Sequence, residues 1–128
     1  MKPPVETVRV SSRSREILIQ VKRKTGLTHW NEICRAGLCR SLANPTRPVR
    51  PAAGWDTALE IEWKTFAGEH AEAFAALTLI RAAKDRLDLR KADAMADYFR
   101  AHLERGISYL KSVQDLRSLA MPEDPLGG

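Results

Sequence analysis

The chain has 128 residues, of which 44% are hydrophobic and 29% are charged, and its formal net charge is +5 at pH 7. A chain of this size and composition can bury an apolar core as one domain without disulfides or a structural metal. No segment approaches the roughly 20 apolar residues that a membrane span needs, and the amino-terminal residues lack the apolar core of a signal peptide. We therefore expect a cytoplasmic protein that spans no membrane.

The positive charge is concentrated near the amino terminus. Residues 1–50 contain eleven Lys and Arg against three Glu, a net charge of +8, whereas residues 51–128 have a net charge of −3. A concentrated basic region favours a polyanion such as nucleic acid as the partner. A solvated basic face with no partner is the alternative.

The first 44 residues form a basic part in which the order strand, helix, helix is predicted. Valine alternates with polar residues over residues 7–10, which indicates a short strand. Ser11 or Ser12 can cap the next helix, because a serine hydroxyl accepts hydrogen bonds from the free amides of the first turn. Gly26 is expected to end this helix in a left-handed conformation.

The second helix of the basic part is expected to begin near Thr28 or Asn31, both of which are good N-cap residues, and to run to about Ala43. Asn44 and Pro45 close it, because the residue before a proline is disfavoured in a helical conformation.

A proline-rich connector without regular structure is predicted for residues 45–56. It contains three prolines, each of which lacks an amide donor and fixes its own backbone torsion. Directly afterwards Leu59, Ile61 and Trp63 alternate with charged residues, which is the two-residue period of a half-buried strand.

Two long helices are predicted after this strand, so that residues 57–120 form the second part of the chain and residues 121–128 a flexible tail. The apolar face of the first of these helices is expected to contain Phe74, Leu77, Ile80, Ala83 and Leu87. The second begins near residue 91 and contains Gly106. The sequence thus predicts one domain over residues 1–128, a mainly α, compact helical domain of about four helices with one or two short strands.

The cysteines predict neither a disulfide nor a metal site. Cys34 and Cys39 are five residues apart, which on a helix separates their directions by about 140°. Side chains that diverge in this way do not form an intrahelical disulfide or share a metal, so we expect small buried hydrophobic residues. His29, His70 and His102 lack a metal-binding spacing, and no metal or other cofactor is expected.

No catalytic arrangement emerges from the sequence. Glu60 and Glu62 share one face of the predicted strand and could form an acid–base pair, but such alternation with apolar residues is typical of a solvated strand face. The sequence has no nucleophile elbow, phosphate-binding loop or dinucleotide-binding fingerprint. We therefore expect a protein that is not an enzyme.

Basic residues of the two amino-terminal helices are the candidate functional site. Short faces that carry guanidinium and ammonium groups can neutralise DNA phosphates, and the amides of a tight turn add neutral donors. Salt bridging is the competing interpretation for Arg35, which forms an i, i+3 pair with Glu32. The predicted DNA-binding residues are Arg13, Arg15, Lys22, Arg23, Lys24, Arg35 and Arg40.

Residues 7–42 resemble the ribbon-helix-helix repressors in their order of a short strand, a helix, a glycine turn and a helix. In that family the strand pairs with its twin from a second chain and enters the major groove. The resemblance implies a transcriptional repressor that binds a specific operator, and it leaves the chain after Asn44 unexplained.

Four blocks carry a second and longer resemblance, namely residues 22–42, 59–69, 79–87 and 99–110. Two patterns within them are specific: NxxCRxxLCxSL, which begins at Asn31, and HxxRGISYL, which begins at His102. These blocks resemble the DndE family, the small subunit of bacterial DNA phosphorothioation systems, which replace a non-bridging phosphate oxygen with sulfur.

The DndE resemblance implies a non-catalytic, mostly helical protein that forms a homo-oligomer such as a tetramer. It implies binding to double-stranded DNA, nicked duplex included, beside the other subunits of the phosphorothioation complex. Asn31, Cys34, Arg35 and Cys39 would then belong to a family scaffold, with the cysteines inward and the basic residues outward. Sulfur transfer through a cysteine is the minor alternative. We therefore expect docking on the DNA backbone, with a ribbon-helix-helix repressor as the alternative.

Overall fold

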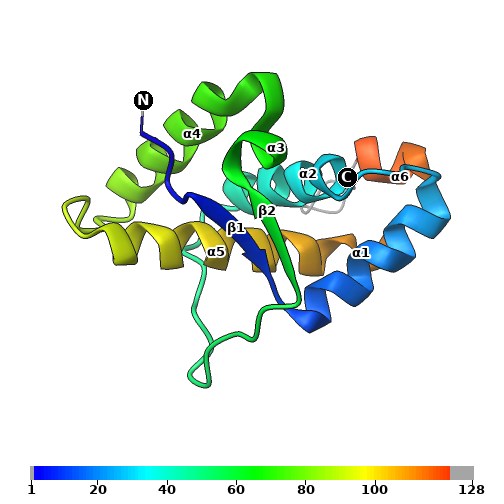
Figure 1. Ribbon diagram of the computed structural model, residues 1–128, viewed down its shortest axis with the longest axis horizontal. Helices are drawn as coiled ribbons and strands as arrows, with labels where there is room; N and C mark the ends of the chain where they lie inside the picture. The colour runs from blue at the N-terminus through cyan, green and yellow to red at the C-terminus, as the bar shows by residue number, and fades with distance from the viewer. Residues whose placement is uncertain (1, 122–128) are drawn as a thin grey trace.

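The structure is a computed structural model that describes residues 2–121. In chain order its elements are β1 (Thr7–Val10), α1 (Ser12–Thr25), α2 (Trp30–Ala43), β2 (Leu59–Glu62), α3 (Trp63–Ala67), the 3₁₀ turn η1 (Gly68–His70), α4 (Ala71–Lys84), α5 (Ala92–Ser108), the 3₁₀ turn η2 (Tyr109–Ser112) and α6 (Leu116–Ala120). The predicted mainly helical fold with four long helices is confirmed (Figure 1). The expected tail falls, apart from its first residue, on residues 122–128, outside the described part. None of the helices within residues 2–121 has the length and apolar character to cross a membrane.

The sheet takes one strand from each part of the chain. β1 and β2 are antiparallel, with Val8 opposite Ile61 and Val10 opposite Leu59. Val8 and Val10 are buried, as their alternation predicts. Because β2 of the same chain lies against β1, this pairing differs from the twin-strand pairing that the ribbon-helix-helix resemblance implies.

The second strand is shorter than predicted, because Trp63 belongs to α3 and not to the strand. Trp63 and Phe66 are three residues apart, so a strand would place them on opposite faces, whereas a helix turns both the same way. Their ring centroids lie 5.7 Å apart, and each ring is also 5.7 Å from that of Phe99. Burial of both rings in one core explains why the chain turns into a helix here.

The predicted ends of α1 are confirmed. The Ser11 hydroxyl caps the helix by accepting a hydrogen bond from the Ser14 amide, at 3.2 Å. Gly26 has a φ of +78° and its amide donates to the Lys22 carbonyl, at 2.9 Å. A positive φ of this kind favours glycine.

The helix α2 begins at Trp30, within the predicted region, but the predicted capping residue is wrong. His29 occupies the N-cap position, where its side chain makes no capping hydrogen bond, and neither Thr28 nor Asn31 does so. Asn31 lies in the first turn, and its amide group donates to the Thr65 carbonyl at 3.1 Å. The Asn31 side chain therefore bonds to α3, which is distant in the sequence, and does not cap its own helix.

The connector has no helix or strand between Ala43 and Leu59, as predicted. Two arginines hold the first residues of the connector against α4 and α5. The Thr46 carbonyl accepts hydrogen bonds from Arg81 at 2.6 Å and from Arg105 at 2.9 Å. After this point the connector forms the loop that extends below α5 in Figure 1 and returns to β2.

The predicted apolar face of α4 is wrong. Leu77 and Ile80 are 48% and 56% exposed, whereas Thr78, Arg81 and Ala82 are buried. Arg81 reaches this position because it donates to the carbonyls of the α2 end and of the connector, and pairs with Asp85 at 3.3 Å. Those hydrogen bonds compensate the burial of a guanidinium group, so α4 turns its large aliphatic side chains outward.

Helices α2 and α5 cross at two glycines, and theirs is the most extensive helix–helix contact in the described chain. A Cβ built on Gly106 would lie 1.9 Å from the Gly37 carbonyl oxygen, so the two backbones touch. This close approach explains the glycine within α5, whose role the sequence leaves open. The largest fully buried apolar side chains around the crossing are Phe66, Phe99, Leu18, Ile33, Leu38, Leu103, Ile107 and Leu110.

Candidate nucleic-acid interface

Five of the seven predicted DNA-binding residues lie on α1, and we refer to them as the α1 cations: Arg13, Arg15, Lys22, Arg23 and Lys24. All are exposed except Lys22, which is half-buried, with its ammonium group 4.1 Å from the centroid of the Trp30 ring. Within residues 2–121 no α1 cation forms an ion pair. Their charge therefore remains available to an anion from outside the chain.

The α1 cations divide between two edges of the helix. At 100° per residue, Arg13 and Lys24 point within about 20° of each other, and so do Arg15 and Lys22 on the opposite edge. Arg23 points outward between the two edges. A single straight row of phosphates therefore meets one edge and Arg23, and not all five side chains.

The two predicted residues on α2 are engaged within the fold. Arg35 donates to the Phe66 carbonyl at 2.7 Å. Arg40 donates to the carbonyls of Ser118 and Leu119, at 2.8 and 3.0 Å, and so satisfies the carboxyl end of α6. No ion pair joins Arg35 to Glu32 in the described residues. Both guanidinium groups therefore hold neighbouring helices in position.

A groove of about 780 Å³ lies between α1, the connector and the end of α5, and we call it the α1–η2 groove. Its exposed cations are Arg13, Arg47 and Lys111, and its aromatic residues are Tyr109, which is exposed, and Trp55, which is half-buried. A smaller pocket of about 260 Å³ shares Lys111 with it and adds Lys24. Only Arg13 and Lys24 are among the residues predicted from sequence, because the groove is assembled from three segments that are distant in the chain.

A family model and a solved structure, both described as DndE, match this chain. A family model described as DNA sulphur modification protein DndE matches residues 7–118. The chain belongs to the DndE family. It shares its fold with the crystal structure of DndE from Escherichia coli B7A, described as involved in DNA phosphorothioation modification, at a TM-score of 0.68 and 24% identity. That similarity covers 83% of this chain and 96% of the other. No sequence among the curated proteins matches the chain.

The two cysteines of this DndE chain differ in their surroundings. Cys34 is fully buried, and burial, together with the Glu104 carboxylate, raises the pKa of its thiol to about 12. Cys39 is exposed, so the expectation that both cysteines pack inward is wrong. Since the two directions differ by about 140° on one helix, α2 cannot turn both side chains into the same core. They form no disulfide.

The polar residues near the end of α5 serve the contact with α2 in this DndE chain. His102 is fully buried with its Nδ1 2.8 Å from the Ser41 hydroxyl, which also accepts a hydrogen bond from Arg105 at 2.9 Å. Burial, followed by the charges of Arg81 and Arg105, lowers the pKa of His102 to about 4. A neutral imidazole at this position packs with its ring centroid 4.8 Å from that of Tyr98. In residues 2–121 no three His, Cys, Asp or Glu side chains are grouped as a metal site.

Proposed function

We propose that this DndE-family chain is a non-catalytic accessory subunit of DNA phosphorothioation that docks on the backbone of duplex DNA, including nicked duplex. The observation that carries the proposal is the set of α1 cations, which are accessible and have no acidic partner in the described chain. Membership of a DNA sulphur modification family supplies the context in which a polyanion is the partner. Other subunits of the same system are the protein partners that this function requires.

The proposed contact is electrostatic and independent of sequence. Lysine and arginine side chains that neutralise phosphates release condensed counterions, so affinity falls steeply with salt. The two edges of α1 allow a DNA backbone to approach from either side, with Arg23 common to both. Nothing in this arrangement reads base edges, and we therefore propose positioning of the subunit without base readout.

A non-catalytic role agrees with the state of Cys34 and His102. The thiol of Cys34 is buried with a raised pKa, so it is a poor nucleophile near neutral pH. His102 is buried and held neutral, where it cannot reach a bound substrate. The subunit would contribute binding, while partner enzymes contribute the sulfur chemistry.

Charge reversal on α1 tests the proposed binding to DNA. Replacing Lys22, Arg23 and Lys24 with glutamate should weaken binding to any DNA sequence on the order of tenfold or more. The slope of log affinity against log salt concentration should become shallower by about 0.9 for every phosphate that is no longer neutralised. Fluorescence anisotropy with one labelled duplex, intact or nicked, at several salt concentrations measures both quantities.

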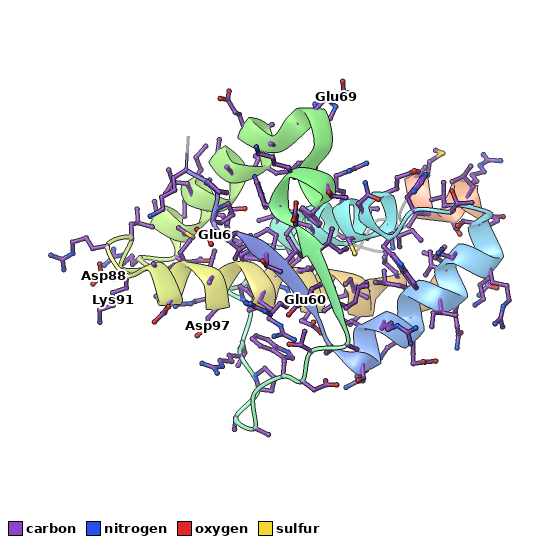
Figure 2. The ribbon with its side chains drawn as sticks, in the orientation of Figure 1. Glu6, Glu60, Glu69, Asp88, Lys91 and Asp97 are labelled. Atoms are coloured by element: carbon purple, nitrogen blue, oxygen red, sulfur yellow. The ribbon has the colours of Figure 1, made fainter. Side chains whose placement is uncertain are left out.

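The matched control for this experiment reverses three exposed charges at the opposite end of the molecule, Lys84, Arg90 and Lys91. Figure 2 shows Lys91 at the end remote from α1. The control variant should lose less than half as much DNA affinity as the α1 variant does. Thermal unfolding checks that both variants are folded. Equal reductions, or unchanged affinity of the α1 variant, would contradict the proposal. Genomic phosphorothioate in cells that carry each variant then tests the pathway.

The subunit is further proposed to form a homo-oligomer in which the exposed face of α4 is one interface. This contact alone gives a dimer, and a tetramer needs a second interface. Leu77 and Ile80 lie about one turn apart and are 48% and 56% exposed, with Ala73 and Ala76 beside them on the same helix. Large and small apolar side chains that alternate on one helix complement the same face of a second copy. A second copy is therefore the occupant that this face fits best.

Replacing Leu77 and Ile80 with glutamate should break the α4 interface, because it would then bury unpaired charges. A dimer would become a monomer, and a tetramer would become a dimer. Sedimentation velocity measures the change in mass. Leu116→Glu is the matched control, since Leu116 on α6 is also 51% exposed. A wild-type chain that sediments as a monomer, or a variant with the mass of the wild-type oligomer, would refute this use of α4.

A further inference from the structure

The α1–η2 groove has a composition unlike the rest of the basic surface, because it combines cations with accessible aromatic rings. One wall is the start of α1, the second is the connector, and the third is the end of α5 with η2. The volume of about 780 Å³ falls within the roughly 300–1,000 Å³ range of clefts that enclose small ligands. A double helix is too wide to enter such a cleft, whereas a single nucleotide is not.

The charge of the groove favours an anion. Arg13, Arg47 and Lys111 are exposed, and none of them forms an ion pair within residues 2–121. Arg47 donates a hydrogen bond to the Asp85 carbonyl at 3.3 Å, which leaves its positive charge without an acidic partner. The two lining carboxylates are already engaged by the fold. Glu104 accepts hydrogen bonds from the Ser11 amide and from the hydroxyls of Ser11 and Ser14, and Asp56 accepts from Ser12. Glu104 also pairs with Arg100, at 3.8 Å. The four cations that line the groove outnumber its two carboxylates, so the net charge of the lining is positive.

Tyr109 supplies the accessible aromatic surface. Its side chain is exposed at the edge of the groove, and its hydroxyl accepts a hydrogen bond from Asn44 at 2.9 Å, which holds the ring in place. Trp55 has one ring face covered by the Arg100 guanidinium, 5.0 Å from the ring centroid. A fixed aromatic ring beside uncompensated cations is the arrangement that binds single-stranded nucleic acid, with bases stacked and phosphates paired.

We propose that the α1–η2 groove binds an unpaired nucleotide of the DNA, with its base stacked on Tyr109 and its flanking phosphates at Arg47 and Lys111. The proposal rests on the DNA-binding function proposed above and adds a second, distinct contact to it. Duplex DNA meets the outer cations of α1, and an unpaired base enters the groove. In a duplex both faces of each base are covered by stacking, so only a frayed or single-stranded position can use Tyr109.

Binding of an oligothymidylate and of a blunt duplex, each measured by fluorescence anisotropy, tests the groove. Tyr109→Leu should weaken oligothymidylate binding about tenfold, whereas Tyr109→Phe, which keeps the ring, should change it less than twofold. Arg47→Gln with Lys111→Gln should weaken oligothymidylate binding and lower its salt slope. All of these variants should bind the blunt duplex within twofold of the wild-type chain. Lys91 is not among the residues that line the groove, and it lies at the end of the molecule remote from α1 (Figure 2), so Lys91→Gln is the charge control.

The outcomes separate this inference from the function on which it rests. If Tyr109→Leu binds oligothymidylate as the wild-type chain does, or weakens both DNAs equally, the groove does not hold a base and the inference is overturned. Competition of oligothymidylate by an acidic peptide but not by thymidine nucleotides would overturn it as well.

Loss of duplex binding on charge reversal of α1, with oligothymidylate binding unchanged, supports both claims. Oligothymidylate binding without any duplex binding supports the groove and refutes duplex docking. Thermal unfolding of Tyr109→Leu and of the double glutamine variant confirms that each is folded.

Discussion

Gly106→Ala is expected to lower the free energy of unfolding by about 3 kcal/mol, one of the largest effects of a single methyl group in this chain. The added Cβ would lie 1.9 Å from the Gly37 carbonyl oxygen and 2.4 Å from its carbon. Both atoms belong to the backbone of α2, so the clash is relieved only if the two helices separate. Urea unfolding followed by circular dichroism measures the change.

Gly37→Ala is the matched control for this prediction. Its Cβ would lie 3.1 Å from the Gly106 carbon and the Ile107 nitrogen, a close approach that a small shift relieves. Alanine also favours a helix over glycine by about 0.8–1 kcal/mol, which offsets part of that cost. The Gly37 variant should therefore be destabilised less than half as much as the Gly106 variant. A Gly106→Ala chain as stable as the wild-type chain would show that the backbones do not touch.

Stability should fall by about 2 kcal/mol between pH 7 and pH 5 through His102 alone. The pKa of His102 is about 4 in the folded chain, against 6.5 for an ordinary histidine. Between these values the unfolded chain binds a proton that the folded chain does not, so unfolding becomes more favourable as the pH falls. The stabilisation is complete above about pH 6.5 and is lost progressively down to about pH 4. Urea unfolding at both pH values measures it.

Removing the imidazole should flatten this pH dependence. In His102→Gln the free energy of unfolding should differ little between pH 7 and pH 5, although the variant is less stable at both values. His29→Gln is the control, because His29 is exposed and should leave the slope as in the wild-type chain. Asp56 and Asp88 have a lowered pKa and lose their contribution only at lower pH. An unchanged slope in His102→Gln would assign the pH dependence to another group.

The parts of the fold that could be predicted from sequence are those with local causes. The cap of α1 at Ser11 and its end at Gly26 depend on groups within four residues, and both predictions are confirmed. The face of α4 was not predictable in this way. Its helix carries apolar residues on several sides, and the orientation is decided by Arg81, whose carbonyl partners at Leu42 and Thr46 lie far away in the sequence.

In the candidate site, too, the features with local causes could be predicted from the sequence and those that depend on distant partners could not. The excess of cations on α1 is visible in the sequence, and their separation onto two edges follows from 100° per residue. The carbonyl partners of Arg35 and Arg40 lie on α3 and α6, which no local pattern indicates. The α1–η2 groove is lined by residues that are distant in the sequence, Arg47 and Lys111 among them, and a side chain in a connector gives no periodic signal of its function.

The basic and acidic parts of the chain interlock. β1 of the first part pairs with β2 of the second, α2 crosses α5 at two glycines, and Thr46 is held by arginines from α4 and α5. A protease that cut the loop after Thr46 would thus leave two fragments clasped together, with the sheet and the helix crossing intact. If a bound polyanion pulled on the amino-terminal fragment, these contacts would transmit the force to the carboxyl-terminal fragment.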